Sequence, residues 1–152
     1  MATTRSAGIL LWRKRDLTLE VFIAHMGGPF WAKKDAAAWS IPKGEYLETE
    51  DELSAAKREF EEEVGVPAPP LPYARLGEFR QSSGKIVVAF AAESDLEVTE
   101  VRSNTFDLEW PPRSGRIQAF PEIDDARWFS IEDARVKVVK GQVAILDSLE
   151  RT

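Results

Sequence analysis

The segment from Thr49 to Gly65 constrains the fold more than any other part of the chain, because it carries the start and stop signals of a helix. Thr49 and Glu52 have the spacing of an N-terminal capping box, and Gly65 is placed to end a helix in a left-handed conformation. Pro67 prevents continuation. We therefore predict a helix from Glu50 to Val64. Its apolar residues form one stripe, which predicts packing against a sheet: Leu53, Ala56, Phe60 and Val64.

The same segment holds the whole charge excess of the chain. Between Glu48 and Glu63 lie eight acidic and two basic side chains, and the rest of the chain is neutral, so the net charge of −6 arises here. On the predicted helix, Glu59, Glu62 and Glu63 share one face. Carboxylates packed in this way repel one another, so the face is either solvated or neutralised by a hard divalent cation such as Mg²⁺. This charge distribution argues against duplex nucleic acid as a partner.

Alternating apolar residues predict strands on both sides of this helix. The segment Lys85–Ala92 has two apolar faces, which is typical of a central strand. A turn-rich insertion is expected at Pro111–Gly115, and a terminal helical region should start at Ser130, break near Gly141 and end near Leu149. The order of elements predicts an α/β fold with a sheet covered on both faces. The predicted strands are Arg5–Arg13, Leu17–His25, Trp39–Pro42, Ala74–Arg80, Lys85–Ala92, Thr105–Trp110 and Ala126–Phe129.

Length and composition limit the class of protein. A chain of 152 residues with 43 % hydrophobic residues is expected to form one domain over residues 1–152. It has no cysteine, which excludes disulfides and thiolate metal sites. No apolar run approaches the roughly 20 residues that cross a bilayer, and Met1–Arg15 lacks the pattern of a signal peptide. We expect a cytoplasmic protein without a membrane partner.

A spaced pattern begins before the helix and ends just after it. Five residues separate Gly44 from Glu50, seven more separate Glu50 from Arg58-Glu59-Phe60, and Glu62-Glu63 and Gly65-Val66 follow at intervals of one residue. This pattern resembles the signature of the Nudix family at every fixed position, with an aromatic Phe60 where an aliphatic residue is usual. The resemblance implies a Nudix-type α/β/α sandwich with a central mixed sheet and a loop-helix-loop metal site. It also implies hydrolysis of a nucleoside diphosphate linked to another moiety, with Mg²⁺ or Mn²⁺.

The resemblance assigns roles by position. Glu59, Glu62 and Glu63 are expected to bind the metal directly or through water, with Glu50 as an outer or additional ligand and the carbonyl oxygen of Gly44 completing the site. Arg58 is expected to pair with these carboxylates and to hold the loop against the helix. An ordinary pair between Arg58 and Glu62, four residues apart, is the simpler interpretation, and both can hold.

A carboxylate is the expected general base, because the chain has a single histidine. Glu62 and Glu63 are the candidates on the helix. Glu122 is the candidate in a later loop, because it lies six residues before Trp128, where several family members have a catalytic or metal-binding glutamate. Its competitor is Glu109, and a surface acid without a role is the alternative.

The substrate is expected to be a small nucleotide. The string Ile41–Glu45 resembles family members that act on dinucleoside polyphosphates, nucleoside triphosphates or diphosphoinositol phosphates, and Lys43 is suited to bind phosphate. Trp31 is the candidate for stacking on a base, and Trp110–Arg116 is predicted to lie on the substrate side. Lys33, Lys34, Arg113 and Arg116 are candidates for phosphate contacts, or else surface cations. Phe30, Trp39 and Phe79 are candidates for stacking, or else core aromatic residues, and His25 is assigned no role.

Two alternatives stay open. The same fold could act on ADP-ribose or another nucleoside-diphosphate sugar, or on capped RNA. A ligand sensor without catalysis is a different class, and the three glutamates Glu59, Glu62 and Glu63 argue against it because a sensor has no need to keep them. The chain is expected to be a monomer or a homodimer.

Overall fold

Seven strands form one mixed sheet with β1 (Arg5–Arg15) at its centre. The computed structural model describes residues 4–152. The expectation of no signal peptide concerns Met1–Arg15, and the first three residues of that segment lie outside the described part. β1 pairs in parallel with β6 (Ile86–Glu93) and antiparallel with β2 (Thr18–Met26). β5 (Ala74–Arg80) continues the sheet beyond β6. On the other side, β3 (Trp39–Ser40) and β9 (Ile123–Ser130) both pair with β2, and β4 (Lys43–Glu45) pairs with β1.

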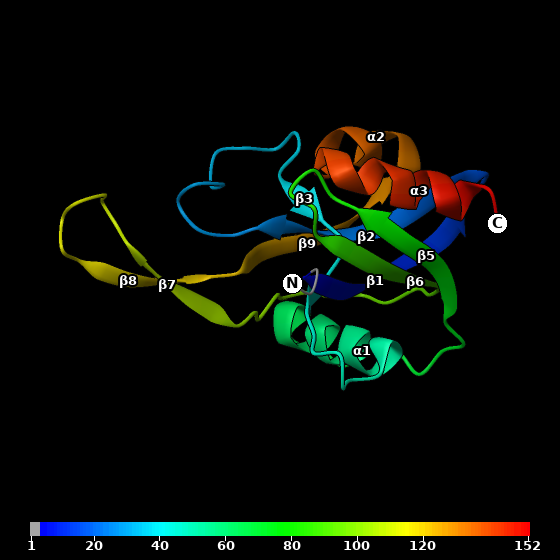
Figure 1. Cartoon of the computed structure of the whole chain (residues 1–152). Helices are drawn as coiled ribbons and strands as arrows, with labels where there is room; N and C mark the ends of the chain where they lie inside the picture. The colour runs from blue at the N-terminus through cyan, green and yellow to red at the C-terminus, as the bar shows by residue number, and fades with distance from the viewer. Residues whose placement is uncertain (1–3) are drawn as a thin grey trace.

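Helices cover both faces of this sheet, as Figure 1 shows. α1 (Glu52–Val64) lies on one face, and α2 (Ile131–Lys137), the short 3₁₀ turn η1 (Lys140–Gln142) and α3 (Val143–Glu150) lie on the other. The two sides of β6 enter two different hydrophobic clusters, one beneath each layer. The expected central position of this strand and the α/β fold with a covered sheet are therefore confirmed.

The start of α1 differs from the prediction. The helix begins at Glu52, and Asp51 rather than Thr49 is its N-cap, since the Asp51 carboxylate accepts a hydrogen bond from the Ser54 backbone N–H at 3.0 Å. Glu50 lies outside the helix, where its side chain accepts a hydrogen bond from Leu47 N–H at 3.1 Å. The predicted end is correct, because Gly65 has a left-handed φ of 94° and donates to the Glu61 carbonyl.

Two strands were missed by the sequence analysis. β8 (Ile117–Pro121) pairs with β7 (Thr105–Glu109) in a separate two-stranded sheet, and the expected turn-rich insertion lies at its tip. The predicted strand Trp39–Pro42 ends at Ser40, and β4 begins after Pro42 as a separate strand that pairs with β1. β9 is also longer than predicted, and the helical region breaks already at Val138. Short, exposed strands such as β8 lack the buried apolar face on which pattern reading depends.

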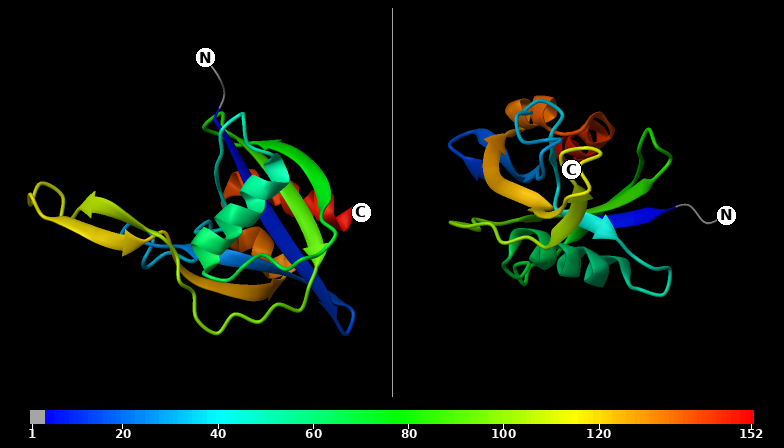
Figure 2. Two further views of the ribbon diagram at one scale, coloured as in Figure 1. Left: turned by 90° about the horizontal axis from the view of Figure 1, so that it is seen from below. Right: turned by 90° about the vertical axis from the view of Figure 1, so that its left-hand side faces the viewer.

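The β7–β8 hairpin projects away from the sheet and its helices in both Figure 1 and Figure 2. Its root is joined to the body by backbone hydrogen bonds from Asn104 N–H to the Glu62 carbonyl (2.8 Å) and from Gly27 N–H to the Glu122 carbonyl (2.8 Å). Within residues 4–152, no helix is both long and apolar enough to cross a membrane.

Candidate active site

Arg58 connects the loop before α1 to the acidic face of the helix. One guanidinium nitrogen, Nη2, donates to Glu50 at 3.0 Å, and the other, Nη1, donates to Glu59 at 2.8 Å and to Glu62 at 3.4 Å. The structure therefore contains both contacts considered from the sequence, the link to the loop and the pair with Glu62 four residues along the helix. The Leu47 N–H and then Arg58 lower the pKa of Glu50, so this carboxylate stays ionised.

Gly44 lies directly against the carboxylate of Glu59. It belongs to β4, where it pairs with Ala7 of β1. A Cβ atom at this position would come within 1.9 Å of Glu59 Oε2, so a side chain here would displace the Glu59 carboxylate. Glycine thus leaves room for this carboxylate against the backbone of β4. The backbone of Gly44 therefore lies beside the Glu59 carboxylate; the metal contact expected of its carbonyl stays a prediction.

Glu63 is the buried member of the cluster. Its side chain accepts a hydrogen bond from Lys43 N–H at 3.3 Å, which connects β4 to α1. Burial raises the pKa of Glu63 to about 8, the Lys43 contacts oppose the rise, and the negative charges of Glu122 and Glu59 add to it. The pKa of Glu59 is also raised, first by burial and then by the neighbouring charge of Glu62.

The donor set suits a hard divalent cation. Carboxylate and carbonyl oxygens are the ligands preferred by Mg²⁺, which keeps several waters and commonly takes only one or two protein carboxylates. Within residues 4–152, no group of three or more His, Cys, Asp or Glu side chains is arranged so that it could hold a metal ion. The crowded, partly buried charges of Glu59, Glu62 and Glu63 nevertheless fit a cation that is completed by water and substrate phosphate.

Glu122 lies next to this cluster although it is 59 or more residues away in sequence. Asn104 links Glu122 to the helix: its N–H donates to the Glu62 carbonyl at 2.8 Å, and its carbonyl accepts from Glu122 N–H. The charge of Glu122 contributes to the raised pKa of both Glu59 and Glu63. Its exposed carboxylate has no cationic partner among residues 4–152. Glu109 instead lies out on β7, where it accepts from Arg113 N–H.

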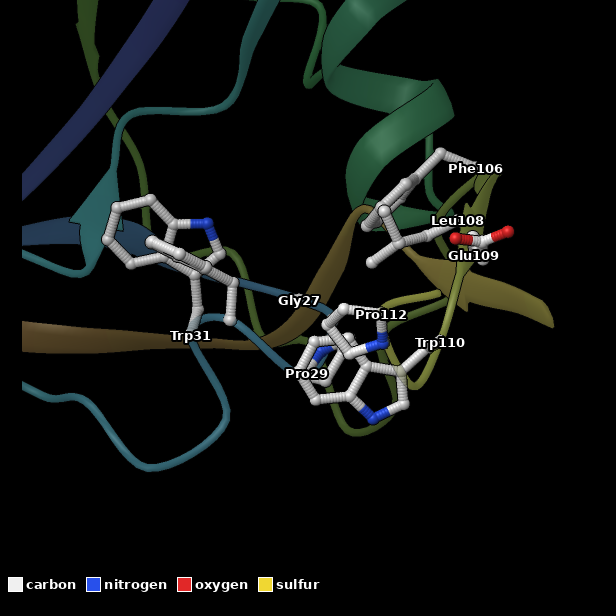
Figure 3. Close-up of a pocket in the computed structure, with 10 residues that line it drawn as sticks. Gly27, Pro29, Trp31, Phe106, Leu108, Glu109, Trp110 and Pro112 are labelled. Atoms are coloured by element: carbon white, nitrogen blue, oxygen red, sulfur yellow. The ribbon is translucent and has the colours of Figure 1, made fainter. Parts of the chain in front are cut away.

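An apolar pocket of about 460 Å³ lies between the loop after β2 and the β7–β8 hairpin (Figure 3). Trp31 lines it, as does Trp110 from the segment predicted to face the substrate. Arg113 and Arg116 are exposed near the tip of the hairpin and do not line the pocket, and Lys33 is exposed on the opposite loop. The structure thus brings two of the aromatic candidates, Phe30 and Trp31, to one cavity but leaves these three cations outside it. The residues that line it are Gly27, Gly28, Pro29, Phe30, Trp31, Phe106, Leu108, Glu109, Trp110 and Pro112.

Most of this pocket was missed by sequence reasoning. Phe106, Leu108 and Trp110 alternate along β7 and its end, and this alternation was the available signal. The alternation predicts only a strand, because nothing in the sequence shows what a projecting hairpin faces. Lys34 was considered for phosphate contact, but its Nζ lies over the ring of Phe30 at 4.2 Å.

The other aromatic candidates lie where the core interpretation placed them. Trp39 is 5 % exposed and packs edge-on against Phe129, and Phe79 packs against the same hydrophobic cluster. His25, to which no role was given, is held between two acceptors: Asp124 Oδ1 lies 2.7 Å from Nδ1, and the Lys34 carbonyl lies 2.6 Å from Nε2. It therefore connects β9 to the loop that forms one wall of the pocket.

The model of the NUDIX domain matches residues 2–149, and the chain belongs to the Nudix family. No curated protein matches the chain in sequence. Among solved structures, a C. elegans Ap4A hydrolase in a binary complex is similar, with 21 % identity, coverage of 98 % of this chain and 96 % of that chain, and a TM-score of 0.64. The NUDIX domain of Shewanella oneidensis NrtR, complexed with ADP ribose, has 16 % identity, coverage of 99 % and 88 %, and a TM-score of 0.65.

A third similar structure is a mutT/nudix family protein from Listeria innocua, with 17 % identity, coverage of 99 % of this chain and 94 % of that chain, and a TM-score of 0.63. These likenesses confirm the expected Nudix fold with its mixed sheet. The family match and the hydrolases among the similar structures agree with the expected enzyme class, a Nudix pyrophosphohydrolase.

Proposed function

We propose that this protein hydrolyses a diphosphate linkage in a nucleoside polyphosphate, either a dinucleoside polyphosphate or a nucleoside triphosphate, with Mg²⁺ or Mn²⁺. The observation that carries the proposal is the meeting of Glu59, Glu62, Glu63 and Glu122 at one end of α1, beside Gly44. These carboxylates come from two distant segments; burial, and then the negative charges of their neighbours, raise the pKa values of Glu59 and Glu63. Such an arrangement is explained by a bound cation better than by a solvated surface.

Different carboxylates would bind the metal and accept the proton. Glu59, Glu62 and Glu63 would hold the metal, with the Gly44 carbonyl beside them and Glu50 attached through Arg58. A bound divalent cation supplies charge neutralisation of the diphosphate and a water of lowered pKa. Glu122 is suited to accept the proton of the attacking water, because its carboxylate is exposed beside the cluster and unpaired among residues 4–152. Lys43, next to Gly44 on β4, would contact a phosphate.

The choice of nucleoside polyphosphates rests on the Ile41–Glu45 string and on the pocket beside the acidic cluster. The similarity to an Ap4A hydrolase agrees with this choice. The similarity to a NUDIX domain complexed with ADP ribose keeps ADP-ribose as the second candidate. A panel of dinucleoside polyphosphates, nucleoside triphosphates, ADP-ribose, capped RNA and diphosphoinositol phosphates, assayed with Mg²⁺ and with Mn²⁺, separates these substrates.

Glu62→Gln tests the metal site directly. We expect kcat to fall by more than tenfold, because one charged oxygen ligand is lost while the side-chain shape is kept. Glu61→Gln is the matched control, since Glu61 lies on the same helix and is exposed. Hydrolysis by Glu62→Gln within tenfold of the unchanged protein contradicts the assignment. Ligand binding without hydrolysis of any substrate identifies a sensor instead.

The cations at the hairpin tip have a test of their own. Replacing both Arg113 and Arg116 with alanine is expected to raise the Michaelis constant for a polyphosphate substrate and to leave kcat largely unchanged, because these side chains would bind phosphates that do not react. Unchanged kinetics rule out a phosphate contact from this segment.

A further inference from the structure

The pocket between the loop and the hairpin has two aromatic walls. Phe30 and Trp31 form one wall, with their rings packed edge to face at 5.5 Å between centroids. Phe106 and Trp110 contribute to the other wall, and Figure 3 shows an open space between the two sides. The walls meet at Gly28, where a Cβ atom would lie 2.8 Å from the Phe106 ring. A volume of about 460 Å³ lies in the range of small-molecule sites.

This pocket adjoins the proposed reaction centre. Gly27, one of its lining residues, donates its N–H to the Glu122 carbonyl at 2.8 Å. Thr105, where β7 begins, follows Asn104, which donates to the Glu62 carbonyl. The roots of both walls are therefore attached to the residues that surround the acidic cluster. The pocket and the acidic cluster are therefore neighbours through these backbone contacts.

The pocket offers few side-chain groups for hydrogen-bond recognition. Glu109 carries the one side-chain carboxylate among its lining residues, and that carboxylate accepts a hydrogen bond from Arg113 N–H at 2.9 Å. In Figure 3 it lies beyond Leu108, away from Trp31. The two tryptophan indoles add only N–H donors. The remaining lining side chains are apolar or absent.

We infer that this pocket binds the planar base of the substrate by stacking and does not discriminate strongly among bases. The inference deepens the proposed function, on which it rests for the identity of the attached phosphates. Every base has a stackable face, so aromatic walls bind all of them. A site that hydrogen-bonds its ligand rejects an analogue by about 10⁴-fold or more, whereas an apolar pocket separates similar ligands by only about 10- to 200-fold.

Titration with nucleoside monophosphates tests the inference separately from hydrolysis. AMP, GMP, CMP and UMP contain no phosphoanhydride bond, so their binding in the presence of Mg²⁺ can be measured by isothermal titration calorimetry without turnover. Ribose 5-phosphate is the matched ligand without a base. We expect the four dissociation constants to span less than about a hundredfold, and ribose 5-phosphate to bind more weakly than each of the four by about fivefold or more.

Two variants assign the effect to the pocket. Trp110→Ala should weaken binding of all four monophosphates by similar factors, and Phe30→Ala, at a side chain that is 65 % exposed, provides a second wall variant that spares the core. Ile117→Ala is the control, because Ile117 is equally exposed on the same hairpin but does not line the pocket. It should bind as the unchanged protein does.

Three results overturn the inference: a span of a hundredfold or more among the four bases, ribose 5-phosphate binding within fivefold of any of them, or unchanged binding in both wall variants. Failure of the proposed function has a different signature. In that case no nucleoside polyphosphate is hydrolysed in the substrate panel, whereas the monophosphates still bind with little dependence on the base.

Discussion

Burial gives Glu63 a pKa of about 8, whereas the ordinary value of a glutamate is 4.5. Desolvation is the main cause, and the charges of Glu122 and Glu59 act in the same direction. Protonation of Glu63 therefore favours the folded state of the metal-free protein. This contribution is complete below pH 4.5, declines as the pH rises, and is absent above about pH 8. A bound cation reverses the preference, because it requires the ionised form.

We predict that Mg²⁺ binding at pH 7 releases up to about one proton per ion, and that the affinity for Mg²⁺ rises with pH until about pH 8. Calorimetric titration in buffers of different ionisation enthalpy measures this release. The free energy of unfolding of the metal-free protein should fall by an amount on the order of a few kcal/mol between pH 5 and pH 8. Glu63→Gln should remove this fall. A variant whose stability has the same pH dependence as the unchanged protein contradicts the assignment.

Glu122 is distinguished from the metal ligands by a different measurement. If it removes the proton from water, Glu122→Gln should lower kcat by about 10²- to 10⁴-fold and leave the dissociation constant of Mg²⁺ largely unchanged. Glu109→Gln is the matched control on the competing residue and should leave kcat largely unchanged. A large loss of Mg²⁺ affinity in Glu122→Gln would identify this residue as a ligand instead.

Among the structural elements, the strand that carries Lys43 and Gly44 depends on the far end of the chain. Gln142 of η1 is fully buried; its Oε1 accepts from Ile41 N–H at 2.9 Å, and its Nε2 donates to Ser40 Oγ at 2.8 Å. Ile41, the donor of the first of these bonds, lies between β3 and β4. The carboxy-terminal layer therefore holds the entry to the metal loop in place.

Gln142→Met keeps the length of the side chain but leaves Ile41 N–H buried without a partner. We expect a loss of about 1–3 kcal/mol in the free energy of unfolding, measured with urea, together with weaker Mg²⁺ binding. Gln118→Met is the control for removal of an amide, since Gln118 bonds to the Trp110 carbonyl outside the main sheet. Unchanged Mg²⁺ affinity in Gln142→Met would show that this contact serves stability alone.

The elements also differ in how far the sequence predicts them. The end of α1 was predictable because Gly65 is a local signal. Its acidic face was predictable because Glu59, Glu62 and Glu63 have helical spacing, whereas the metal site assigned from the pattern between Gly44 and Val66 stays a prediction. The N-cap was wrong by two residues, since Thr49 and Asp51 both offer a side-chain oxygen and only the three-dimensional path of the loop selects one. The contacts of Gln142 and Glu122 join segments 59 to 102 residues apart, and no local pattern records them.

At the scale of the whole molecule, stability and recognition lie in different places. The two hydrophobic clusters lie on opposite faces of the main sheet, while the β7–β8 hairpin forms its own sheet outside both of them. Figure 2 shows this hairpin extending away from the layers that contain the cores. Because burial of apolar surface is the main source of stability, the hairpin contributes little to it. It provides one wall of the proposed base pocket.

Replacement of residues 106–120 by a short Gly-Ser linker separates these two roles. Thr105 and Pro121 are paired neighbours at the root of the hairpin, so a short linker can join them. We expect cooperative unfolding with Tm lowered by less than about 4 °C, equivalent to roughly 1 kcal/mol for a chain of this size. The nucleoside monophosphates should then bind no better than ribose 5-phosphate, because one wall of the stacking site is gone. A truncated protein that still binds all four monophosphates more tightly than ribose 5-phosphate places the base elsewhere on the molecule, and loss of cooperative unfolding shows instead that the hairpin supports the core.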